Sequence, residues 1–199
     1  MSRYLFCSLH AVAFLSKPGP HSLDCAKHVF CYLNGTKDLW LLYGRVGDVG
    51  DDGLKGYVDT DGSMHEDCHA ISGYTFIFDG GAVSWSLKRQ DIISLSTTES
   101  KYVAAAHAAK EALWLCQFIG QIFKPFELPT TLFCNNQSAI ALTKDQQYHA
   151  RTKHIDIWFH FLHWITEKGY IRLIYCPTAE MVADTITKAL PSTKVKHFT

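Results

Sequence analysis

The order of strand-like and helix-like segments after residue 53 is the feature that most constrains the fold. Three short strand-like segments come first, and Asp79-Gly80-Gly81 predicts a hairpin turn between the second and third. Ser96-Thr97-Thr98-Glu99 has the form of a capping box and predicts a long helix after it. The predicted strands are residues 54–60, 72–78, 82–88, 131–135 and 171–176, and the predicted helices are 96–120, 137–143, 154–168 and 179–190. This order predicts an α/β domain with one five-stranded mixed sheet flanked by helices.

A helical appendage is expected in front of that domain. Two helices are predicted within residues 1–44: the first ends at Lys17-Pro18-Gly19-Pro20, and the second spans about 22–33. A stretch rich in Gly and Asp follows and has the character of a linker. The predicted division is a helical appendage at 1–44, a linker at 45–53, the α/β domain at 54–191 and a tail at 192–199.

The apolar run at residues 4–15 has two interpretations, a signal peptide or an amphipathic helix. Ser8 and His10 interrupt it and a Pro-Gly-Pro breaker follows, which favours the helix. No run reaches the roughly 18 apolar residues of a membrane span. The seven cysteines are an odd number without a C-x-x-C pair, which favours reduced thiols and an intracellular chain, cytoplasmic or nuclear. His65, Cys68 and His69 lie close together without the paired spacing of a structural zinc site.

The charge balance excludes one class of nucleic-acid-binding protein. Lys plus Arg and Asp plus Glu both number 19, so the formal net charge is zero and a strongly basic coat protein is excluded. A local basic patch is still allowed, because steering depends on where charges lie rather than on their sum.

Three carboxylates and one amide lie where strands end or helices begin: Asp59, Glu99, Asn135 and Asp184. Carboxylates gathered at one end of a sheet could hold two Mg²⁺ or Mn²⁺ ions, which prefer oxygen ligands and can promote phosphodiester hydrolysis. Each of the three carboxylates also has a purely structural interpretation. Asp59 could form a turn, Glu99 could be the reciprocal arm of the capping box, and Asp184 could complement a helix dipole. The residues alone leave these alternatives open.

Residues 54–191 resemble the ribonuclease H region of copia-type retrotransposon polyproteins. The similar stretches, in chain order, are Gly56-Tyr57-Val58-Asp59-Thr60-Asp61, Ser72-Gly73-Tyr74, Gly80-Gly81-Ala82-Val83-Ser84-Trp85-Ser86, Ser96-Thr97-Thr98-Glu99-Ser100-Lys101-Tyr102, Ala109-Lys110-Glu111-Ala112-Leu113-Trp114-Leu115, Asn136-Gln137-Ser138-Ala139-Ile140-Ala141-Leu142, Arg151-Thr152-Lys153-His154-Ile155-Asp156 and Ala183-Asp184-Thr185-Ile186-Thr187-Lys188-Ala189-Leu190-Pro191. Tyr32-Leu33-Asn34-Gly35-Thr36-Lys37 resembles the end of the reverse transcriptase that precedes this region.

The resemblance implies a ribonuclease H-like fold and two-metal hydrolysis of the RNA strand of RNA–DNA hybrids. It implies catalytic positions at Asp59, Glu99, Asn135 and Asp184, with two Mg²⁺ or Mn²⁺ ions held by Asp59, Glu99 and Asp184. Asn135 departs from the family, which has Asp at this position. An amide brings no negative charge, so metal binding and hydrolysis are expected to be severely reduced. Whether Asp61 compensates for this loss is left open.

The resemblance also implies partners, namely an RNA–DNA hybrid and the polymerase domain of a retroelement. His149, Arg151, Lys153 and His154 form a local basic cluster that could contact hybrid phosphates or could be a solvated helix cap. Aromatic residues between 158 and 164 are expected in the core rather than in a base-stacking platform. Two alternatives to an impaired ribonuclease stay open: a non-catalytic nucleic-acid-binding remnant, and a polyprotein fragment that does not fold.

Overall fold

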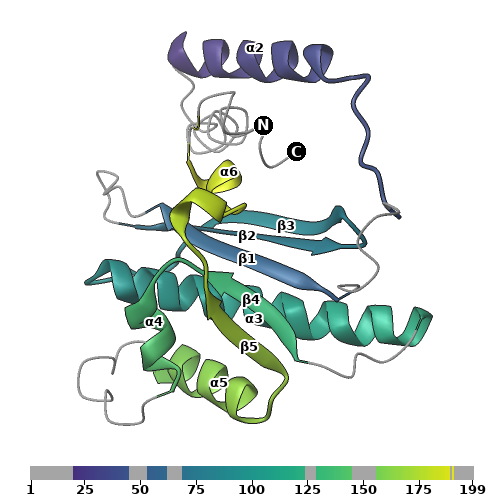
Figure 1. The fold of residues 1–199 in the computed structure, drawn as a ribbon. Helices are drawn as coiled ribbons and strands as arrows, with labels where there is room; N and C mark the ends of the chain where they lie inside the picture. The colour runs from purple at the N-terminus through teal and green to yellow at the C-terminus, as the bar shows by residue number, and fades with distance from the viewer. Residues whose placement is uncertain are drawn as a thin grey trace.

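The computed structural model of the chain describes residues 20–44, 53–61, 69–123, 129–144, 156–188 and 190. Figure 1 shows their arrangement. The strands are β1 (Lys55–Asp61), β2 (Ile71–Phe78), β3 (Gly81–Arg89), β4 (Thr130–Cys134) and β5 (Ile171–Tyr175). The helices are α2 (Pro20–Gly35), α3 (Thr97–Ile122), α4 (Gln137–Leu142), α5 (Asp156–Glu167) and α6 (Asp184–Thr187), with a 3₁₀ turn, η3, at Thr178–Glu180.

The strands form one mixed sheet in the order β3-β2-β1-β4-β5, which confirms the predicted architecture. The first three strands are antiparallel neighbours, whereas β4 runs parallel to β1 and β5 runs parallel to β4. The predicted hairpin turn is also confirmed. Asp79 and Gly80 have φ values of 51° and 77°, the two positive angles that a tight turn of matching twist requires.

One face of the sheet is covered by α3, α4 and α5, and α6 lies over the other (Figure 1). The long helix α3 packs closely because the side of it that faces the sheet is rich in alanine, and Ala105, Ala106 and Ala109 are fully buried. Phe159 and Leu162 of α5 are buried beside it, as expected for core aromatic and aliphatic residues, while Trp164 is exposed.

The ends of two helices follow from local sequence. Ser96 has an extended conformation and its side chain accepts a hydrogen bond from the backbone N–H of Glu99, so the predicted capping box begins α3. After α5, Gly169 adopts a φ of 73°, and the N–H of Tyr170 donates to the carbonyl of Ile165 at 3.0 Å. This is the left-handed stop that a glycine after a helix predicts.

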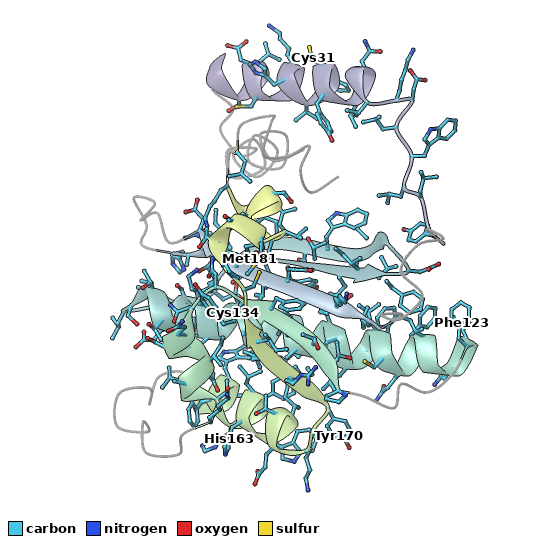
Figure 2. The ribbon with its side chains drawn as sticks, in the orientation of Figure 1. Cys31, Phe123, Cys134, His163, Tyr170 and Met181 are labelled. Carbon is cyan, nitrogen blue, oxygen red and sulfur yellow. The ribbon has the colours of Figure 1, made fainter. Side chains whose placement is uncertain are left out.

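The predicted single helix over residues 179–190 is wrong. The structure has the turn η3 and the short helix α6, and Met181 between them has a ψ of 98°, outside helical geometry. Met181, labelled in Figure 2, is fully buried in a cluster with Cys176 and Ala183, against which Tyr57 and Phe133 of the sheet pack. Burial of this side chain therefore bends the chain where local propensity alone favours a continuous helix.

The appendage is described from residue 20 onward, and the predicted helix before it lies outside the described residues. Helix α2 stands apart from the sheet (Figure 1), and Leu23 and Phe30 on it are exposed. The described cysteines are free thiols, three of them buried. Within the described ranges, each helix is too short or too polar to cross a bilayer.

Candidate functional site

The site is built around Asp59 in β1, whose side chain is fully buried. Because β1 and β4 are parallel and Val58 is paired with Cys134, the next residues, Asp59 and Asn135, lie side by side where β4 ends. The amide nitrogen Nδ2 of Asn135 donates a hydrogen bond to Oδ1 of Asp59 at 3.1 Å. The sheet register thus unites two of the four residues that the sequence predicts for the site.

Lys101 enters this site from the second turn of α3. Its Nζ lies 2.8 Å from Oδ1 of Asp59 and also donates to the amide oxygen of Asn135. The side chain of Lys101 is only 16% exposed, so its charge is held mainly by these two acceptors rather than by water. The amino group of Lys101 therefore bridges Asp59 of β1 to Asn135, the residue that follows β4.

Helix α6 closes the site from the opposite face of the sheet. Nζ of Lys188 lies 2.9 Å from Oδ2 of Asp59 and 2.8 Å from Oδ1 of Asp184, the first residue of α6. The hydroxyl of Thr187 donates to Oδ2 of Asp59 at 3.0 Å. Asp184 therefore lies close to Asp59, linked to it by Lys188, a residue for which the sequence predicted no role in the site.

The start of α3 is held in place by a buried glutamine. Nε2 of Gln90 donates to the hydroxyl of Ser72 at 2.7 Å and to the carbonyl of Ser100 at 2.8 Å, and its Oε1 accepts from Ser94 at 3.0 Å. These bonds tie the residue that precedes Lys101 to β2. Gln90 is thus a positioning residue, and its isolated polar side chain carries no sequence signal for that role.

Glu99 has a structural role in α3. Its Oε2 accepts a hydrogen bond from the backbone N–H of Leu95 at 2.7 Å, while its own backbone N–H donates to Ser96. Glu99 therefore has a capping role, although its carboxylate accepts from Leu95, the residue before the N-cap, rather than from Ser96 as in a capping box. The side chains of the next two residues reach β1: the Ser100 hydroxyl lies 3.5 Å from that of Thr60, and Nζ of Lys101 contacts Asp59. The capping pattern at Ser96-Thr97-Thr98-Glu99 was the sequence signal that could have pointed to Lys101 in place of Glu99.

Charge compensation sets the protonation of the site. Burial alone would raise the pKa of Asp59, but Lys101 and then Lys188 outweigh it and lower that pKa from 3.8 to about 2. Burial and the neighbouring Asp59 raise the pKa of Asp184. The pKa of Lys188 is raised above 10.5, because its bonds to Asp184 and Asp59 overcome its desolvation. Two acidic side chains, Asp59 and Asp184, therefore face the amino groups of Lys101 and Lys188.

This arrangement does not fit the two divalent ions that the sequence predicts. Among the described residues, no group of three or more His, Cys, Asp and Glu side chains could hold a metal. Asp59 is bound to two lysines, and Asn135 turns an NH₂ donor toward it. Asp61, the other carboxylate considered, is the half-buried last residue of β1. The metal ligation that was predicted from the sequence is not assembled here.

The predicted basic cluster of His149, Arg151, Lys153 and His154 lies outside the described residues. Its contact with nucleic acid stays a prediction.

Comparisons with known proteins place the chain in a family. No protein-family model matches it. A retrovirus-related Pol polyprotein from the tobacco transposon TNT 1-94 is 38% identical over 190 residues, which are 93% of this chain and 14% of that polyprotein. The secreted RxLR effector protein 161 of Plasmopara viticola is 39% identical over 103 residues, covering 51% of this chain and 70% of that protein.

The fold is similar to that of the N-terminal RNase H domain of a Mycobacterium tuberculosis protein. The TM-score is 0.51 at 8% identity, over 74% of this chain and 99% of the other. The sheet order and the flanking helices described above are thus those of an RNase H-like α/β fold. The chain spans only 12 to 14% of the length of the three transposon polyproteins that it matches. It belongs to the retrovirus-related Pol polyproteins of copia-type transposons, of which it carries an RNase H-like region.

Proposed function

We propose that this chain is a retrotransposon RNase H domain that binds RNA–DNA hybrids and has lost most or all of its ability to hydrolyse the RNA strand. The proposal rests on the family and the fold for the ligand, and on the charges of the site for the loss of hydrolysis. The single observation that carries the second part is the pairing of Asp59 with both Lys101 and Lys188.

The position of the site supports an origin in nuclease chemistry. Asp59 and Asp184 lie 125 residues apart in the sequence, and Lys188 bridges their side chains beside β1. A buried carboxylate pair brought together by tertiary structure is costly unless it has a partner, so such a pair is typical of functional sites. In this family that function would be cleavage of an RNA strand.

The charges of the site argue against that cleavage in the present sequence. Two-metal hydrolysis needs anionic ligands that hold the ions and let them activate water. Here the negative charges of Asp59 and Asp184 are already balanced by two ammonium groups, and the third position is the neutral Asn135. The geometry therefore favours the non-catalytic alternative over an active ribonuclease.

Cleavage of a labelled RNA–DNA hybrid in Mg²⁺ or Mn²⁺ tests the loss of hydrolysis. We expect cleavage by the natural chain and by Asn135→Asp to stay at or near the limit of detection, because Lys101 still neutralises Asp59. The double variant Asn135→Asp/Lys101→Glu places negative charge at both positions. We expect it to cut at least about 100-fold faster, since metal catalysis is worth several kcal/mol and each 1.36 kcal/mol is a factor of ten.

Two controls make this result decisive. Lys88→Glu reverses an exposed lysine of the same chain, one that pairs with Asp91, and should leave cleavage unchanged. Circular dichroism establishes that each variant is folded. Cleavage by the natural chain at the rate of the double variant would refute the proposed loss of hydrolysis.

Binding is tested separately, by fluorescence anisotropy with hybrid, duplex DNA and duplex RNA of equal length. We expect the natural chain to bind the hybrid with an affinity that falls as salt rises, because phosphate contacts release counter-ions. Arg151→Ala and Lys153→Ala should weaken this binding if the basic cluster contacts the phosphates. Equal or absent binding of all three nucleic acids would reject the hybrid as the ligand.

A further inference from the structure

We infer that Lys101 and Lys188 are permanent internal counter-ions of the strand-end carboxylates, so that the domain folds without a divalent metal and excludes one from Asp59 and Asp184. The inference concerns the site of the proposed function. It rests on the contacts of Asp59 and stands whether or not the domain binds a hybrid.

The hydrogen bonds of Asp59 are the first step of the argument. Its Oδ1 is approached by Nζ of Lys101 and by Nδ2 of Asn135, and its Oδ2 by the Thr187 hydroxyl and Nζ of Lys188. An ionised carboxylate has about four lone-pair positions. Four donors therefore occupy the whole acceptor capacity of Asp59, and a metal could bind it only by displacing them.

Charge is the second step. A divalent ion bound to Asp59 would lie beside the amino groups of Lys101 and Lys188, which are 2.8 and 2.9 Å from the carboxylate oxygens of Asp59. Like charges at such distances repel strongly in a partly buried site, where water screens them weakly. Lys101 is held in place by the packing of α3 and has the Asn135 oxygen as a second acceptor, so it cannot turn away without losing both bonds.

The origin of the four donors is the third step. Lys101 belongs to α3, Asn135 follows β4, and Thr187 and Lys188 belong to α6 or its end. One carboxylate thus connects the central strand to three further segments of the fold. In this position a metal ion would cross-link the same segments, and here the protein supplies that cross-link from its own side chains.

Direct measurement of Mn²⁺ binding to the natural chain tests the inference without any nucleic acid. We expect electron paramagnetic resonance to detect no site tighter than about 1 mM, the weak end of protein sites for hard cations. We also expect the melting temperature to be the same in EDTA and in excess Mn²⁺. A tighter site that disappears in Asp59→Asn would overturn the inference, whereas a signal that persists in Asp59→Asn comes from elsewhere and agrees with it.

Variants of Lys101 then test its role as counter-ion. Lys101→Gln should lower the melting temperature by at least about 5 °C in EDTA, because a buried carboxylate loses its partner. Lys88→Gln, which breaks an exposed lysine–aspartate pair of 3.1 Å, should change it by no more than about 2 °C. Lys101→Arg keeps the positive charge, so its melting temperature should be the same with and without Mn²⁺. Equal effects of Lys101→Gln and Lys88→Gln would overturn the assignment.

Lys101→Glu provides the converse result. With a third carboxylate beside Asp59 and Asp184, we expect the EDTA-treated protein to be destabilised by like-charge repulsion and to recover at least part of its melting temperature in Mn²⁺. This response depends only on metal and heat, so it is independent of hybrid binding. A failure here and a failure of the proposed function are therefore distinguishable.

Discussion

At the scale of single residues, Asp59 carries the buried charge that binds Lys101, Asn135, Thr187 and Lys188. It is fully buried, yet it stays ionised because two lysines, an amide and a hydroxyl surround it. A buried ion pair contributes little net stability compared with apolar packing, but removal of one partner leaves an uncompensated charge. Loss of Lys101 should therefore be costly, because it leaves the buried Asp59 without one of its two charged partners.

The depressed pKa of Asp59 predicts an acid-sensitive contribution to stability. The folded pKa of about 2 lies below the ordinary 3.8, so the contribution is fully present above pH 3.8 and is lost as the pH falls toward 2. We expect the difference in unfolding free energy between the natural chain and Asp59→Asn to shrink by about 2 kcal/mol over this range. Urea titrations at a series of pH values measure it, and a difference that stays constant would contradict the prediction.

At the scale of elements, contact between α6 and β2 depends on Gly73. This residue is paired with Asp59 across the two strands, and a Cβ added to it would lie 2.4 Å from Cγ2 of Thr187. A methyl group in that space must push α6 away from the sheet. The small residue in β2 therefore lets α6 approach closely enough for Thr187 and Lys188 to reach Asp59.

Gly73→Ala should consequently destabilise the protein by about 1–3 kcal/mol, the usual cost of overpacking. It should also reduce the effect of Lys188→Gln, because Lys188 is already displaced from Asp59. A double-mutant cycle by urea denaturation measures this coupling. Gly35→Ala is the matched control, since a Cβ there would meet nothing within 4 Å. Additive effects of Gly73→Ala and Lys188→Gln would show that α6 does not depend on this contact.

At the scale of the whole molecule, stability is concentrated between the sheet and α3. Phe76 is fully buried in this core, whereas residues 39–43 form a run of five large apolar side chains that are each at least half exposed. Tyr43 is attached to the hairpin by a hydrogen bond from its hydroxyl to the carbonyl of Ala82 at 2.7 Å. The segment before the domain is therefore joined to the sheet at one end without adding to its core.

Phe76→Ala should cost about 3–5 kcal/mol of unfolding free energy, because it leaves a cavity under α3. Trp40→Ser should change it by less than about 0.5 kcal/mol, because the side chain of Trp40 is 85% exposed. Chemical denaturation followed by far-ultraviolet circular dichroism compares the two. A loss for Trp40→Ser comparable to that for Phe76→Ala would mean that this segment packs on the core.

Local sequence patterns determined most of the architecture. The turn at Asp79-Gly80, the cap at Ser96 and the stop at Gly169 act over a few residues, so propensity and hydrogen bonding predict them well. Met181 is the exception, since its burial against Tyr57 and Phe133 breaks the predicted last helix. That contact joins residues more than 40 positions apart, and no local pattern encodes it.

In the candidate site, too, local sequence predicts some features and tertiary packing decides the others. The sequence by itself predicted that Asp59 and Asn135 lie at or near the ends of two strands and that a long helix begins after Ser96, because these depend on alternation and capping. The pairing of β1 with β4, which makes the two residues neighbours, came from the tertiary structure. Only the tertiary structure decided that Lys101 rather than Glu99 reaches Asp59, and that Lys188 bridges Asp59 to Asp184. The rotation of α3 on the sheet and the close approach of α6 at Gly73 select these side chains, and both result from packing between segments distant in the chain.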